Sequence, residues 1–131
     1  MAATVFSANR SNVLLDGEAI EGLQSLDYRM ETEREDIRAI GSGERIGVSF
    51  GLRTVRGELA VRSADYRLDA LLERQGEFQL VVNLKQDEFS EFPKRTQAFD
   101  GCYVEEKKSG MGAGGTVLTI YVFTATRLRE E

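Results

Sequence analysis

The segment that decides the fold runs from Ile20 to Glu31 and reads IEGLQSLDYRME. Its even positions carry Ile20, Leu26 and Tyr28, while most of its odd positions are charged or polar. This period of two is typical of a β-strand with one buried face and one wet face. The segment therefore predicts a long, half-buried strand.

Strand-like patterns recur on both sides of this segment. The dipeptide Asp16-Gly17 precedes it and is a strong hairpin signal. The segment 116–128 is apolar on both faces, which is typical of a central strand or of a strand with one face in an interface. The predicted strands are residues 12–16, 20–31, 45–63, 78–84, 97–107 and 116–128.

One helix interrupts the series of strands, at about residues 64–75. Ser63 is a suitable N-cap, and the leucines at positions 68, 71 and 72 follow helical spacing. Gly76 supplies a C-terminal stop. The order of strands, helix and strands predicts an α+β fold, mainly antiparallel, in which one helix flanks a β-sandwich or open barrel. The length predicts a single domain over residues 1–131.

Two stretches lack a clear pattern. Residues 32–44 are charged and then glycine-rich, which predicts a long loop with little core of its own. Ile37 and Ile40 are its large apolar residues, and we expect them to contact another subunit because they have no evident partner within the chain. A plain surface loop is the alternative. Residues 86–96 form a second polar loop around Pro93.

The composition argues against catalysis. The sequence has no histidine, so the commonest general base and metal ligand is missing. Cys102 is the single cysteine and has no histidine to activate it. The glycines at 110–115 neither match a dinucleotide fingerprint nor open a helix. We therefore expect no catalytic, cofactor-binding or metal-binding residues. The apolar run 117–122 is too short for a membrane anchor.

Several segments, in their order along the chain, resemble tail tube proteins of contractile phage tails and related contractile injection systems. The resemblance covers nearly the whole chain. It is carried by the Asp16-Gly17 turn with Ile20–Leu26, by Ile40–Glu44, Val48–Gly51 and Val55–Leu59, by the pair Leu71-Leu72, and by Phe99–Val104 and Thr124–Leu128.

The resemblance implies a structural role without enzyme activity. In that family six subunits close a ring, their sheets join into a barrel around a lumen, and the rings stack into a tube. DNA or protein cargo passes through the lumen without specific binding. The implied partners are other copies of the chain, sheath proteins and baseplate proteins. The implied location is a virion tail or injection particle that is assembled in the bacterial cytoplasm.

Two sets of residues follow as candidate sites. Polar residues on the two longest predicted strands are candidates for lining the lumen, although alternation by itself also fits the solvated face of a monomer. The expected lumen-facing residues are Glu21, Ser25, Asp27, Arg29, Arg56, Glu58 and Arg62. The expected ring-stacking residues in the predicted loop are Glu33, Arg34, Glu35, Asp36, Ile37, Arg38 and Ile40.

Two alternatives stay open at the level of sequence. A tube-initiating or tube-terminating baseplate protein would share the fold and stop at one ring. A small monomeric β-barrel that binds an apolar ligand would instead enclose a cavity. The overall net charge of −5 would suit a DNA conduit, but the residues expected in the lumen are mixed in sign.

Overall fold

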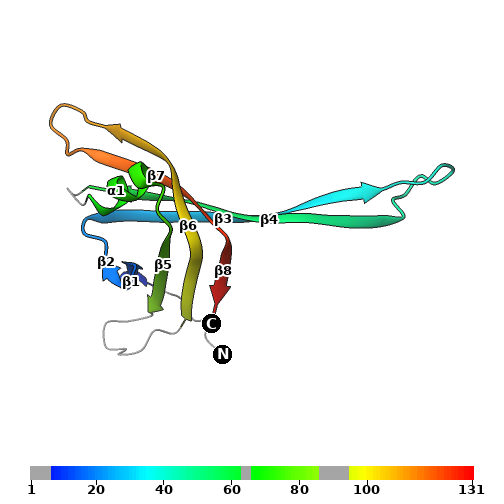
Figure 1. Cartoon of the computed structure of the whole chain (residues 1–131), viewed down its shortest axis with the longest axis horizontal. Coiled ribbons are helices and arrows are strands. Elements are labelled where there is room, and N and C mark those ends of the chain that lie inside the picture. The colour runs from blue at the N-terminus through cyan, green and yellow to red at the C-terminus, as the bar shows by residue number, and fades with distance from the viewer. Residues whose placement is uncertain (1–6, 63–65, 86–94) are drawn as a thin grey trace.

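The computed structural model describes residues 7–62, 66–85 and 95–131, with side chains from residue 11 onward. The strands and the helix form a body from which one long hairpin projects (Figure 1). The elements are β1 (Ser7–Leu15), β2 (Glu18–Ala19), β3 (Leu23–Ile37), β4 (Gly47–Val61), α1 (Arg67–Arg74), β5 (Phe78–Lys85), β6 (Arg95–Gly110), β7 (Leu118–Ala125) and β8 (Arg127–Glu130).

All strands belong to one antiparallel sheet in the order β2-β1-β5-β6-β7-β4-β3, with β8 beside β6. The long strand β6 joins two layers. Its first half pairs with β5 and β8, and its second half pairs with β7. Gly101, with φ of 63°, lies between these halves, where the strand changes partners. The predicted fold class, mainly antiparallel β with one helix, is confirmed.

The core lies between the two layers and is built on three aromatic rings. Phe99 and Phe123 are fully buried and meet edge to face, with ring centroids 5.8 Å apart. Phe78 makes a similar contact with Phe123. Ile20 and Leu59 are also buried. Tyr28 is 39% exposed, but its ring still packs edge to face on Phe99.

Helix α1 packs against the body through Leu68 and Leu71, which are buried as their spacing predicts. The helix begins at Arg67, and the proposed N-cap Ser63 lies outside the described residues. The left-handed position at its end is occupied by Gln75 rather than Gly76. None of the described helical segments has the length and apolar character that a membrane crossing needs.

The prediction of a loop over residues 32–44 is wrong, because β3 continues to Ile37 and pairs with β4 down to Gly47. Beyond the pair Val55↔Ala125 no described strand supports this hairpin. We call residues 31–54 the arm. Hydrophobic and polar residues alternate along a strand when one of its faces is buried. Neither face of the arm is buried, so residues 32–37 lack this alternation. A register shift between Thr32 and Arg34 also breaks the phase of the alternation.

The last predicted strand is two strands, β7 and β8, with a bend at Thr126. The amide of Thr126 donates to the carbonyl of Asp100 at 2.9 Å, so the chain turns from one half of β6 to the other. Central β7 has buried side chains on both faces, as the sequence predicts. The expected loop around Pro93 lies mostly outside the described residues.

Candidate assembly interface

Strands β3, β4, β7 and the second half of β6 form a sheet whose outer side we call the polar face. The register places Asp27 opposite Glu58 and Arg29 opposite Arg56. Thr124 of β7 is the next neighbour of Arg56. The structure thus brings together the members of the expected lumen set that lie on strands: Ser25, Asp27, Arg29, Arg56 and Glu58.

Two members of the expected lumen set lie at the end of this sheet, outside the strands. Glu21 sits in the turn before β3. Arg62 follows β4, and its guanidinium donates to the side chain and carbonyl of Thr116. These two side chains therefore border the polar face where the hairpin between β6 and β7 begins.

The polar face carries charges of both signs, and residues of like charge lie opposite each other on neighbouring strands. Asp27 opposite Glu58, and Arg29 opposite Arg56, are like-charge pairs, which destabilise a sheet unless other charges compensate. One compensation is visible, because Arg56 reaches past β7 to Glu105, with Nη1 and Oε2 2.7 Å apart. Sequence reasoning missed Glu105, since its place depends on a register shift between Val104 and Glu106. The face is wet and mixed in sign.

The sheet has two open edges. No described strand pairs with the outer edge of β3, or with the outer edge of β6 over Tyr103–Gly110. Since each neighbouring pair from β6 to β3 is antiparallel, these two border strands run in opposite directions. Unpaired edges of this kind are templates for association.

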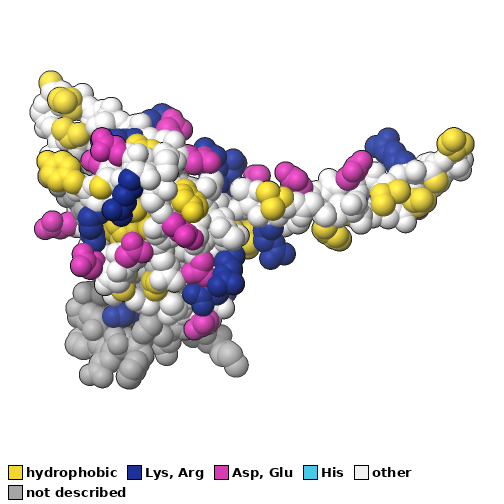
Figure 2. Space-filling view, in the orientation of Figure 1, with side chains coloured by type: hydrophobic (Ala, Val, Ile, Leu, Met, Phe, Trp, Pro, Cys, Tyr) yellow, Lys and Arg dark blue, Asp and Glu magenta, His cyan; other side chains and the backbone are white. Residues whose placement is uncertain are grey.

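The arm exposes large apolar side chains that a two-stranded ribbon cannot bury. Figure 2 shows them along the arm and at its tip. Ile37 and Ile40 are exposed, as the sequence predicts. Phe50 and Leu52 are 71% and 70% exposed, and sequence reasoning placed them on a predicted strand without assigning them to an interface. Ile46 is a further exposed member of this group.

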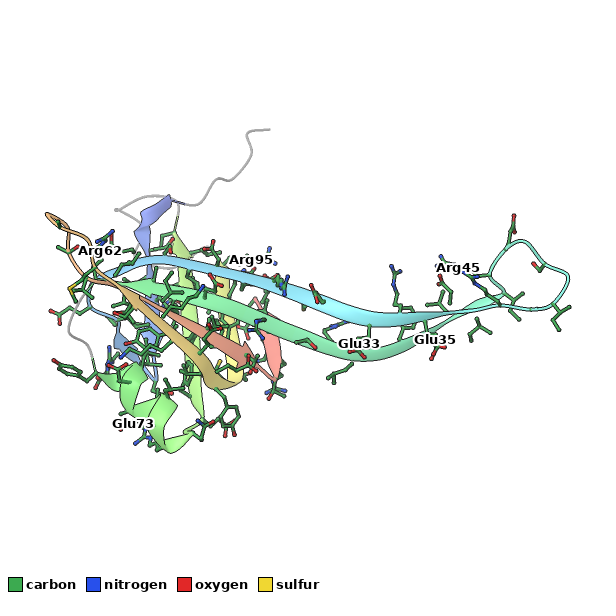
Figure 3. The ribbon with its side chains drawn as sticks, turned by 90° about the horizontal axis from the view of Figure 1, so that it is seen from above. Glu33, Glu35, Arg45, Arg62, Glu73 and Arg95 are labelled. Carbon is green, nitrogen blue, oxygen red and sulfur yellow. The ribbon has the colours of Figure 1, made fainter. Side chains whose placement is uncertain are left out.

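Charged residues of the expected stacking set lie on the same arm. Asp36 is paired with Arg45, with carboxylate and guanidinium 2.9 Å apart. Figure 3 shows Glu33 and Glu35 along the arm, away from the body. The set falls on one projecting element, although five of its members lie on a strand rather than in a loop: Glu33, Arg34, Glu35, Asp36 and Ile37.

A hollow of about 550 Å³ lies between β3 and the β1–β5 pair. Its lining is uncharged and includes Val13, Leu23, Leu26 and Leu84. These four side chains also pack against the core, so the hollow is continuous with the sandwich interior. The hollow is partly open to solvent, whereas the binding-module alternative requires an enclosed cavity.

Chemically reactive groups are scarce in the described part of the chain. Burial raises the pKa of the Cys102 thiol to about 12, and its sulfur contacts the carbonyl of Phe99 at 3.2 Å. A thiol of this kind is a poor nucleophile at neutral pH. Over the described ranges, no cluster of histidine, cysteine, aspartate or glutamate residues could hold a metal ion.

Solved structures similar to this chain share its fold over nearly its whole length. The cap that terminates the tube of the anti-feeding prophage has a TM-score of 0.80 and 11% identity, covering 100% of this chain and 93% of the cap chain. A chain from the sheath–tube complex of the extracellular contractile injection system PVC, in its extended state, has a TM-score of 0.76 and 13% identity, with 97% and 91% covered.

The SPP1 tail tube has a TM-score of 0.71 and 14% identity, covering 97% of this chain and 79% of the tail tube chain. No protein-family model matches the sequence. A search of curated proteins also gives no match. At 11–14% identity these similarities establish architecture rather than activity. This chain has the tail tube fold.

Proposed function

We propose that the chain is a structural subunit of a tail tube, which closes into hexameric rings that stack into a hollow conduit for DNA or protein cargo. The observation that carries the proposal is the pair of open, oppositely directed edges on β3 and β6. Rotation about a ring axis preserves strand direction along that axis. The β3 edge of one copy would then meet the β6 edge of the next as an antiparallel pair, like every joint within the sheet.

The polar face supports a role as lumen wall. A barrel made of sheets from several subunits is too wide for side chains to fill, so its inner face must tolerate water. Ser25, Asp27 and Arg29 on β3, and Arg56 and Glu58 on β4, satisfy this condition on one side of the sheet. The other side of the same strands holds core residues such as Leu59. The mixed signs would let cargo pass without being held.

The arm supports stacking. An isolated two-stranded hairpin is at best marginally stable in water. A contiguous exposed row of apolar side chains is typical of a surface that binds another protein. The arm is long enough to leave its own body and reach another copy (Figure 1). We assign the contact between rings to its apolar residues, which now include Ile46, Phe50 and Leu52 beside Ile37 and Ile40.

A tube-terminating or tube-initiating protein is the second candidate, because a tube cap is among the similar structures. Both candidates place the chain in a tail or injection particle with sheath and baseplate partners. They differ in what the purified protein does alone. A tube subunit polymerises through two ring faces, while a cap stops after one ring. The monomeric binding module predicts neither rings nor filaments.

Negative-stain electron microscopy of the purified chain over a range of concentrations tests the proposal. We expect rings at low concentration and hollow filaments at high concentration. The double variant Phe50→Asp and Leu52→Asp should keep the body folded and abolish filaments, because charge cannot be buried at an apolar contact without a large cost.

The matched control is Tyr66→Asp, since Tyr66 is 72% exposed and lies on the body at the start of α1. It should form filaments like the wild type. A wild-type chain that stays monomeric at every concentration would overturn the tube proposal. Single rings that never stack would favour the cap.

A further inference from the structure

On β3, one tyrosine anchors the root of the arm to the body. Tyr28 lies on β3 two residues before the last pair that a third strand supports, Met30↔Val55. Its ring packs on Phe99 with centroids 5.1 Å apart and an interplanar angle of 76°. Its hydroxyl accepts a hydrogen bond from Nε2 of Gln97 at 2.8 Å. Besides the pairing of β4 with β7, which ends at Val55↔Ala125, the root of the arm is thus held by one ring contact and one polar contact.

The polar contact continues to the C-terminal strand β8. Gln97 is the one buried polar or charged residue in the described part of the chain, at 8% exposure. The same Nε2 donates its second hydrogen to Oε1 of Glu130 at 2.7 Å. Arg95 pairs with the other carboxylate oxygen of Glu130. A single buried amide therefore links the arm root to β8.

The carboxylate of Glu130 is stabilised in its charged form by this arrangement. Hydrogen bonds from Gln97 and Arg95, and a smaller contribution from Tyr28, lower its pKa. Because the charged carboxylate accepts these bonds, their geometry is maintained at neutral pH.

Strand β8 is itself fixed to the body. It pairs with β6 from Gln97↔Glu130 to Asp100↔Arg127. The carboxylate of Asp100 binds Arg127 at 3.0 Å and Arg129 at 2.5 Å. Because β8 is held at both ends in this way, it can restrict the movement of Tyr28 instead of moving together with it.

We propose that β8 is a brace for the arm, which sets the direction of the arm through Gln97 and Tyr28. The arm acts as a lever, because the seven residues from 31 to 37 span about 23 Å as a strand. A tilt of about 10° at the root would move the end of β3 by roughly 4 Å, more than the length of a hydrogen bond. Its consequence for ring stacking rests on the proposed function, whereas the brace itself is a property of the single chain.

Distances between two spin labels on one chain test the brace directly. The labels are placed at Ser42→Cys on the arm tip and Glu73→Cys on α1, and buried Cys102 should not take up label. The measurement uses the background with Phe50→Asp and Leu52→Asp, which prevents stacking, and the labelled chain is mixed with an excess of unlabelled chain so that only distances within one chain are measured. In the double variant Tyr28→Phe and Glu130→Gln, we expect the width of the distance distribution to increase about twofold, because the root loses its polar contact.

The matched control is Tyr103→Phe with Glu106→Gln, which changes the same chemical groups on the second half of β6, away from the arm root. This control should leave the distribution unchanged. The single variant Tyr28→Phe retains the ring contact and should give a smaller broadening in the same direction. Circular dichroism and thermal unfolding establish that each variant is folded.

An unchanged distribution in the folded double variant, or equal broadening in the control, would overturn the brace. Since only distances within one chain are measured, this result is independent of whether the wild type forms rings. If the brace holds and the wild type never assembles, the proposed function fails while the brace stands.

Discussion

The body and the arm are built from the same two strands, yet they differ in what their side chains touch. On β4, Leu59 is fully buried in the body, while Phe50, nine residues earlier, is 71% exposed in the arm. The two parts of β4 differ in their neighbours, because β7 and the opposite layer cover β4 from Val55 onward. A substitution in the body part of this hairpin should therefore change the stability of the fold. A substitution in the arm should change association between copies instead.

The largest contrast is expected between two phenylalanines. Phe123→Ala removes a fully buried ring that contacts both Phe78 and Phe99, and should cost about 3–5 kcal/mol of the free energy of unfolding. Phe50→Ala should change it by less than about 0.5 kcal/mol, because the ring is exposed in the monomer. Urea unfolding of both variants at low concentration measures the difference. Comparable losses would show that the arm contributes to the core.

Two glycines give a contrast of intermediate size. A Cβ at Gly57 would lie 2.6 Å from Phe123 Cζ and 2.8 Å from the carbonyl oxygen of Asp27. Gly57→Ala should therefore destabilise the body by about 1–3 kcal/mol. Gly47→Ala in the arm meets only Ile37 Cδ1 at an ordinary 3.7 Å, so it should be neutral or slightly stabilising. Thermal unfolding distinguishes the two, and an equal loss of stability would contradict the close packing at Gly57.

The smallest expected effect concerns Asp100 of the body and its dependence on pH. Hydrogen bonds from Arg129, Gln79 and Arg127 hold the pKa of this carboxyl well below its ordinary value of 3.8. The lowered pKa stabilises the folded state above about pH 4, and this stability is lost as the pH falls through the folded-state pKa. Asp100→Asn should cost about 1–2 kcal/mol at pH 7 and less at pH 3.

Urea midpoints of the wild type and of Asp100→Asn at both pH values provide the measurement. The matched control is Asp36→Asn, whose partner Arg45 is an exposed arm residue, so the difference from wild type should be near zero at both pH values. A constant difference for Asp100→Asn between pH 7 and pH 3 would mean that the charge of the Asp100 carboxylate contributes little to stability.

The sequence was most informative where a strand or helix has one buried face. Alternation over 20–31 and helical spacing at Leu68 and Leu71 predicted a strand and a helix that the structure contains. The same reasoning failed for residues 32–37, because an arm without a core gives no alternation to read. The exposure of Ile46, Phe50 and Leu52 was not predicted for a related reason, since an apolar residue on a strand is normally a core residue.

By itself, the sequence determined a mainly antiparallel sheet with one helix and a set of polar residues on two long strands, because local periodicity and turn residues are enough for this. Only the tertiary structure decided that these strands extend beyond their neighbours, and that β6 and β3 form the open edges of one sheet. The same holds for the contacts that Gln97 makes with Tyr28 and Glu130. These features depend on which strands pair and where pairing ends, and contacts between residues as far apart as 28 and 130 leave no trace in a local pattern.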